Sequence, residues 1–274
     1  MKYPTTAFLG HMDARMVLEW LAMRWPTHLT PDAPKIIMSG TRKDLPKSDL
    51  EQIPGPLFKL METRFARGLL RDGTVRVGTL LDFQNTEAHG GLVLDHSEGT
   101  KTVRNDRAHI DLRDPAQWSE VTEAMFGSRE PTNVHFAGID LRYQEISENC
   151  MVFCLSEAFS SEAYSAMGDG PAYDCCLRVN DIPAFVDALT TALRARLGEL
   201  SVSVVRCVYD DRERSRDTDD GVHPAMLKGV EYRGQQEVRI LWLPESSHAL
   251  EPIVLTVPKL ASLVSHHHSK SQGT

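Results

Sequence analysis

Residues 232–242 have the sequence YRGQQEVRILW, and this stretch decides most of what the chain can be. Side chains alternate between the two faces of a β-strand. As a strand, the stretch directs Val238, Ile240 and Trp242 to one face, which predicts that this face packs into a core. The other face carries Gln235 and Glu237, with arginines on either side. A solvated strand surface has this pattern, and so does the wall of a polar cleft that holds one carboxylate for chemistry.

The 274-residue chain has the composition of a soluble globular protein, with 41% hydrophobic and 25% charged residues. The net charge of −8 disfavours nonspecific binding to nucleic acid, because phosphate contacts rest on Lys and Arg, although a local basic groove remains compatible with it. No apolar stretch approaches the roughly 20 residues that span a bilayer, and the N-terminus lacks the pattern of a signal peptide. We therefore expect a cytoplasmic protein with no membrane partner.

The five cysteines favour buried, reduced thiols. Their number is odd, and Cys154, Cys176 and Cys207 lie in apolar, strand-like runs. A zinc site needs CxxC pairs or a Cys/His set at ligand spacing, and neither is present. The acidic loop segments 82–87 and 95–99, with His89 and His96, are a weak metal candidate, and a solvated loop is the favoured interpretation. The sequence therefore predicts no metal.

The pattern of elements indicates an α+β fold with mixed, mostly antiparallel sheets and flanking helices. Strands are expected in clusters without regular βαβ alternation. A helix should begin after Asp181, with Pro183 in its first turn, and end at Gly198. Further helices are expected at 13–24, 63–70 and 115–126, loops at 40–56, 85–106 and 210–221, and strands at 36–38, 57–61, 74–81, 134–139, 151–155, 175–179, 202–209, 232–242 and 253–257.

These elements suggest three parts of the chain. Residues 1–55 are expected to form an N-terminal helix and a linker that is rich in proline and charge. Residues 56–260 should form the main domain. Residues 261–274 include three consecutive histidines and are expected to be a disordered tail.

Several polar residues on the early and central strands are candidates for ligand binding. Lys59, Arg76 and Thr79 lie on early strands, where a phosphate-bearing ligand would meet them, although charge on strand edges is common. Ser156 follows the buried strand 151–155, and hydroxyls at such strand ends often point into a cleft. The chain has no GxSxG, P-loop or GxGxxG motif, and no Ser-His-Asp triad can be assigned.

Four segments occur in a characteristic order: LLRDGTVRVGTLLDFQNTE at 69–87, DHSEG at 95–99, MVFCLSEAF at 151–159 and KGVEYRGQQEVRILW at 228–242. Their order resembles the bacterial members of the ADP-ribosyltransferase-like superfamily that occur in toxin–antitoxin and phage-defence settings. The resemblance covers residues 57–243 and leaves the first fifty residues outside it.

The resemblance implies a role for each matching residue. Glu237 matches the catalytic glutamate of the family, and Gln235 matches the residue two positions before it. Ser156 corresponds to the hydroxyl of the middle strand. The first strand element departs from the family pattern, because it offers Lys59 and Arg76 without the characteristic histidine or arginine motif. Tyr232 or Phe159 would stack on nicotinamide.

The function implied is that of an NAD-dependent ADP-ribosyltransferase, a toxin with NAD as substrate and RNA, DNA or protein as acceptor. An antitoxin or a chaperone would be its partner. The alternative is a catalytically inactive module of the same fold that binds a nucleotide or a partner. A third possibility is an interaction protein that docks through its N-terminal helix at 13–24.

Overall fold

The computed structural model describes residues 6–10, 35–53, 55–84, 97–105, 109–111, 135–137, 140–160, 173–245 and 249–269. The chain forms two compact units, and each unit combines three separate segments. The first contains residues 1–42, 100–147 and 212–224, and the second contains residues 43–99, 148–211 and 225–274. This division differs from the expected parts 1–55, 56–260 and 261–274, because strand pairing joins segments that are distant in the sequence. The helices expected at 13–24 and 115–126 lie outside the described residues.

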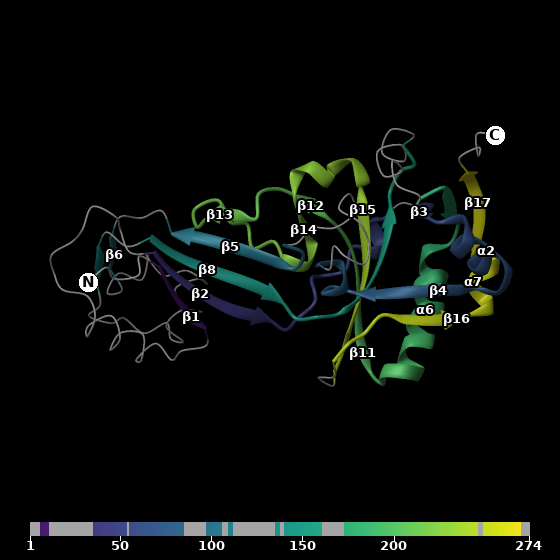
Figure 1. The fold of residues 1–274 in the computed structure, drawn as a ribbon, viewed down its shortest axis with the longest axis horizontal. Coiled ribbons are helices and arrows are strands. Elements are labelled where there is room, and N and C mark those ends of the chain that lie inside the picture. The colour runs from purple at the N-terminus through teal and green to yellow at the C-terminus, as the bar shows by residue number, and fades with distance from the viewer. Residues whose placement is uncertain are drawn as a thin grey trace. The chain divides into compact units, whose positions relative to one another are not determined.

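The first unit contains a mixed five-stranded sheet (Figure 1). The strands β5 (Thr100–Asn105) and β8 (Asp140–Ser147) pair antiparallel, and the other neighbours in this sheet pair parallel. Its interior holds the buried Lys101 amine, which lies 3.1 Å from Glu145 and 3.2 Å from Asp219. The strands are, in spatial order, β1 (Thr6–Gly10), β2 (Lys35–Arg42), β8 (Asp140–Ser147), β5 (Thr100–Asn105) and β13 (Glu213–Ser215), with a separate pair β6 (His109–Asp111) and β7 (His135–Ala137).

The second unit is built on an antiparallel sheet of eight strands. Six of them follow the spatial order β11 (Leu200–Arg206), β15 (Glu237–Pro244), β9 (Met151–Ser156), β3 (Leu57–Met61), β10 (Cys175–Val179) and β17 (Val264–Ser269). The strand β4 (Thr74–Thr79) also pairs with β9, and β16 (Ile253–Thr256) pairs with β4. A short parallel pair, β12 (Val208–Tyr209) and β14 (Leu227–Lys228), completes the strands described in this unit.

Among the described residues, three helices cover the core of the second unit. They are α2 (Thr63–Asp72), α6 (Ile182–Leu197) and α7 (Pro258–Leu263) (Figure 1). The helix α6 begins as the sequence predicts, because the Asp181 side chain accepts a hydrogen bond from the Ala184 amide at 3.0 Å. Gly198 ends it. Within the described ranges, no helix is both long and apolar enough to cross a membrane. Short 3-10 helices are η1 (Leu50–Gln52), η2 (Asp82–Gln84), η4 (Pro224–Met226) and η5 (Val230–Gln235).

The stretch 232–242 is a strand only in its second part. Residues up to Gln235 belong to the 3-10 helix η5, and β15 begins at Glu237. Gln236 joins them in the left-handed region, with φ of 43°. The expected faces are confirmed from Glu237 onward, because Val238, Ile240 and Trp242 are fully buried in the main core. The Trp242 indole donates a hydrogen bond to Thr190 at 2.8 Å.

The histidine-rich segment near the end of the chain forms regular secondary structure. Residues expected in a disordered tail complete α7 and form β17, which pairs antiparallel with β10. The pattern of side chains gives no sign of this strand, because four of its six residues are polar and exposed. Backbone groups on an open sheet edge pair with any extended segment, so the edge of β10 explains the strand.

Candidate functional site

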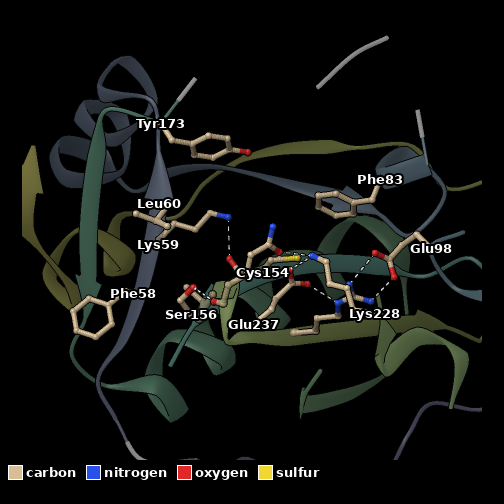
Figure 2. A pocket seen from close by; sticks show the side chains of 13 residues that line it. Phe58, Lys59, Leu60, Phe83, Glu98, Cys154, Ser156, Tyr173, Lys228 and Glu237 are labelled. Atoms are coloured by element: carbon tan, nitrogen blue, oxygen red, sulfur yellow. Dashed lines mark hydrogen bonds and ion pairs between the residues drawn. The ribbon is translucent and has the colours of Figure 1, made fainter. Parts of the chain in front are cut away.

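Three neighbouring strands place a phenyl ring, a hydroxyl and a carboxylate in one row. Phe58 on β3 stands opposite Ser156 on β9, and Ser156 stands opposite Glu237 at the start of β15. Directly opposed residues of antiparallel strands point to the same face of the sheet. Phe58, Ser156 and Glu237 therefore share one face, and Figure 2 shows them in this order.

A pocket lies beside this row, where β3 separates from β9. The pair of Phe58 and Ser156 joins β3 to β9, whereas further along β9 Val152 stands opposite Gly78 of β4. In the gap, the Lys59 amine donates a hydrogen bond to the carbonyl of Cys154 at 2.9 Å. The lysine thus takes the place of a strand partner for this carbonyl. Its amine also lies 4.8 Å from the centre of the Phe153 ring.

Four charged side chains form a buried chain of ion pairs at the floor of the pocket. One carboxylate oxygen of Glu237 accepts a hydrogen bond from Lys228 at 2.5 Å, and the other accepts one from Arg239 at 2.6 Å. Arg239 donates two further hydrogen bonds to the Glu98 carboxylate, at 2.7 and 2.9 Å. None of the four side chains is more than 8% exposed. Charges this deep are tolerated only when they are paired and hydrogen-bonded, as they are here.

The ion pairs keep Glu237 ionised. Burial by itself raises the pKa of this carboxyl group, but the charges of Lys228 and Arg239 and their hydrogen bonds outweigh it, so that the pKa lies well below its ordinary value. Burial tends to lower the pKa of Lys228, and the Glu237 carboxylate overcomes this and raises it. The site therefore presents a carboxylate that stays negative at neutral pH.

This shift predicts a specific acid sensitivity. Because the folded-state pKa of Glu237 is lowered, its contribution to stability is fully present above the ordinary glutamate pKa of about 4.3. It is lost as the pH falls from there towards the lowered value. We expect the free energy of unfolding, measured in urea, to fall more steeply below about pH 4 in the wild type than in Glu237→Gln. Equal slopes in the two proteins would contradict the pairing.

The pocket combines polar groups with aromatic walls and has an empty volume of about 600 Å³, which includes solvent at its mouth. In the buried chain, the carboxylates of Glu98 and Glu237 balance the cations of Lys228 and Arg239. A protonated Lys59 therefore gives the pocket a net positive charge. The aromatic side chains that line the pocket are Phe58, Phe83 and Tyr173. The polar side chains that line it include Lys59, Ser156, Lys228, Gln235, Glu237 and Arg239 (Figure 2).

The turn before β15 brings Gln235 to the pocket although it is not on the strand. Its side-chain oxygen accepts a hydrogen bond from Lys228 at 2.6 Å, and its backbone carbonyl accepts one from the Ser156 hydroxyl at 2.5 Å. The carbonyl of Gln236 accepts a hydrogen bond from the Glu157 amide at 2.9 Å. The left-handed region is costly for a residue other than glycine, and these hydrogen bonds hold Gln236 there.

Four of the residues predicted from the sequence meet in this pocket, and three do not line it. Lys59, Ser156, Gln235 and Glu237 come together. Arg76 is exposed on β4 and forms an ion pair with Asp82 at 2.7 Å. Thr79 is buried and accepts a hydrogen bond from the Asp82 amide at 3.1 Å. Tyr232 lies on η5 with its ring centre 5.1 Å from the Lys228 amine.

Sequence reasoning missed several residues of the site. For Glu98 the sequence favours a solvated acidic loop, and this interpretation is wrong, because Glu98 is 2% exposed and paired with Arg239. Lys228 begins the segment 228–242 that carries the resemblance, but no pattern in the sequence marks it as a site residue. Tyr173 lines the pocket from just before β10, where the sequence gave no signal.

The cysteines near the pocket are poor nucleophiles. Burial raises the pKa of the Cys154 thiol to about 12 and raises that of Cys207 well above its ordinary value. The Cys207 sulfur lies 3.7 Å from Glu237 and can donate to its carboxylate. Within the described part of the chain, no group of three or more histidine, cysteine or acidic residues is placed to hold a metal ion.

Comparison with known proteins finds no match to a family model, to a curated protein or to a solved structure.

Proposed function

We propose that the protein is an NAD-dependent ADP-ribosyltransferase and that Glu237 is its catalytic carboxylate. One observation carries the proposal: an ionised glutamate lies at the floor of a pocket that also holds a hydroxyl, an amide, a lysine and aromatic rings. Such groups suit a dinucleotide, because its ribose hydroxyls, phosphates and flat bases can meet hydrogen-bond partners, a cation and aromatic rings.

The chemistry would proceed as follows. The bond between nicotinamide and C1 of its ribose breaks, nicotinamide leaves as a neutral molecule, and positive charge develops on the ribose ring. The Glu237 carboxylate stabilises that charge, and it does so inside a low-dielectric pocket where electrostatic effects are large. A nucleophile of the acceptor then forms a bond to C1 and releases its proton to solvent.

The other pocket residues have supporting roles in this proposal. Gln235 lies two residues before Glu237, and Ser156 stands opposite Glu237 on the neighbouring strand β9. Both would orient the ribose hydroxyls. Lys228 and Arg239 hold the Glu237 carboxylate in position through their ion pairs with it. Tyr173 would pack against a base, since it is aromatic and lines the pocket. A toxin of this kind would need an antitoxin or chaperone to protect its own cell.

The test is release of nicotinamide from labelled NAD by the purified protein, with cell lysate as the source of acceptor. Label transferred to RNA, DNA or protein supports a transferase and identifies the acceptor class. A folded protein that releases no nicotinamide and transfers no label would contradict the proposal.

A second function is favoured by one specific observation. Both carboxylate oxygens of Glu237 already accept hydrogen bonds from cations, Lys228 and Arg239. A ligand would then meet an ionised carboxylate whose charge is already offset by two cations, as suits a module that binds a nucleotide without turnover. NAD binding in calorimetry without nicotinamide release would support this function over the first.

Lys59 provides a further prediction, because it is the cation in the pocket that no carboxylate neutralises through a described ion pair. Burial lowers its pKa, and a ligand phosphate beside it would raise the pKa again. Lys59→Met keeps the apolar stem and removes the charge. We expect the affinity for NAD to fall about 10- to 150-fold, the range for a hydrogen bond to a charged group.

The matched control for Lys59→Met is Arg76→Met. Arg76 was predicted for the same role but is exposed on β4 and lies outside the pocket lining. Its variant should bind NAD like the wild type in the same calorimetric titration. Equal losses in the two variants would place the phosphate elsewhere.

A further inference from the structure

The row of residues that contains Glu237 continues to an exposed arginine. Arg178 on β10 stands opposite Phe58, which stands opposite Ser156, which stands opposite Glu237. Neighbouring strands are about 4.8 Å apart, so Arg178 lies three strands, or roughly 14 Å, from Glu237 on the same face. Arg178 is exposed and makes no side-chain hydrogen bond or ion pair with the described part of the chain.

Four rings gather beside Arg178 at the edge of the sheet. The His267 ring lies 4.8 Å from Phe58 and 4.9 Å from Phe159, measured between ring centres. Phe159 also lies 5.3 Å from His268 and 6.3 Å from Phe58. Both histidines are exposed, and their strand β17 is the last of the sheet. We call Phe58, Phe159, His267 and His268 the ring cluster.

The position of the ring cluster suits a polymer better than a small enclosed ligand. It is open to solvent along the outer strand, and through Phe58 it is continuous with the pocket. Flat rings stack on any nucleobase, because every base has a π-face, and an arginine provides a contact for the adjoining phosphate. With a net charge of −8 for the chain, binding must come from stacking more than from general attraction to phosphate.

We infer that the ring cluster and Arg178 bind a segment of single-stranded nucleic acid, with one unpaired base on the rings and its phosphate on the arginine. The next nucleotides would run along the row towards Ser156 and Glu237. Binding of the strand stands on these contacts alone. Its role as the acceptor of ADP-ribose rests on the proposed function.

Fluorescence anisotropy with dye-labelled single strands of ten nucleotides, RNA and DNA, tests the inference, with the duplex of the same sequence beside them. Single strands should bind more tightly than the duplex, since only unpaired bases can stack on the rings. His267→Ala and Phe159→Ala should each weaken single-strand binding about 5- to 150-fold. Arg178→Ala should reduce the slope of log affinity against log salt by about 0.7, the value for one phosphate.

Each variant has a matched control. His266→Ala changes the neighbouring histidine, which is bonded to Ser269 at 2.7 Å and belongs to no ring contact of the cluster. Phe65→Ala removes a phenylalanine that is 53% exposed on α2, and Arg71→Ala removes an exposed arginine of the same helix. These three should bind single strands like the wild type. Melting temperatures of all six variants separate loss of binding from loss of fold, and Arg178→Ala keeps the test valid if a ring variant unfolds.

Three results would overturn the inference. The first is that folded ring variants bind single strands like the wild type, and the second is that the duplex binds as tightly as the single strands. The third is that NAD competes with the strand and that the ring variants lose affinity for NAD as much as for the strand. The last result would assign the rings to the dinucleotide. The two proposals fail separately. Single-strand binding in a wild-type protein that releases no nicotinamide upholds the binding surface and removes the transfer, whereas release without strand binding does the reverse.

Discussion

Replacing Glu237 by glutamine should reduce nicotinamide release from NAD by at least about a hundredfold, the loss seen when one preorganised electrostatic group is removed from an active site. Glutamine has nearly the same shape, so the change removes the negative charge that the developing positive charge on the ribose requires. Binding of NAD should be affected less than turnover, because the charge develops mainly in the transition state. The measurement is kcat and KM for release from labelled NAD.

The matched control is Glu231→Gln, which neutralises an exposed glutamate on η5 six residues earlier. It should release nicotinamide at the wild-type rate. Because Glu237 also pairs with two buried cations, the melting temperature of Glu237→Gln must be measured first. In folded protein, full activity of this variant would rule out Glu237 as the catalytic group.

Replacing Arg239 by methionine should cost about 3–5 kcal/mol in the free energy of unfolding, which is the typical effect of removing one partner from a buried ion pair. Arg239 is 2% exposed and is bonded to both Glu98 and Glu237, as well as to the carbonyl of Ala225 at 2.6 Å. Without it, the Glu98 and Glu237 carboxylates both lose a buried cation that is bonded to them. Urea denaturation should show a lower midpoint with an unchanged slope, since the surface exposed on unfolding stays nearly the same.

Arg71→Met is the comparison for this stability effect. Arg71 also forms an ion pair, with Asp72 at 2.7 Å, but its side chain is 80% exposed. Exposed pairs of this kind contribute about 0–1 kcal/mol, so its urea midpoint should be close to the wild-type value. If Arg239→Met were as stable as Arg71→Met, the buried chain of ion pairs would not support the fold as described.

The sequence predicted the elements whose signals are local. The helix after Asp181 has its cap, its proline and its final glycine within one segment, and it forms between Ile182 and Leu197 as expected. The runs at 151–155 and 175–179 are apolar throughout, and both are central strands of the second unit. The α+β class follows from the same local signals and is what the structure has.

The sequence by itself also determined that Val238, Ile240 and Trp242 share a buried face, because alternation along a strand is a property of the backbone. Tertiary structure decided everything that depends on long-range pairing. The register of β3, β9 and β15 aligns Phe58, Ser156 and Glu237 across residues far apart in the chain, and the edge of β10 orders a histidine-rich segment that has no apolar pattern. The burial of Glu98 against Arg239 belongs to the same class, because 141 positions separate the two. A charged residue in a polar loop can form a buried ion pair only when a distant part of the chain places an opposite charge beside it and so offsets its desolvation. No local sequence pattern indicates such a contact.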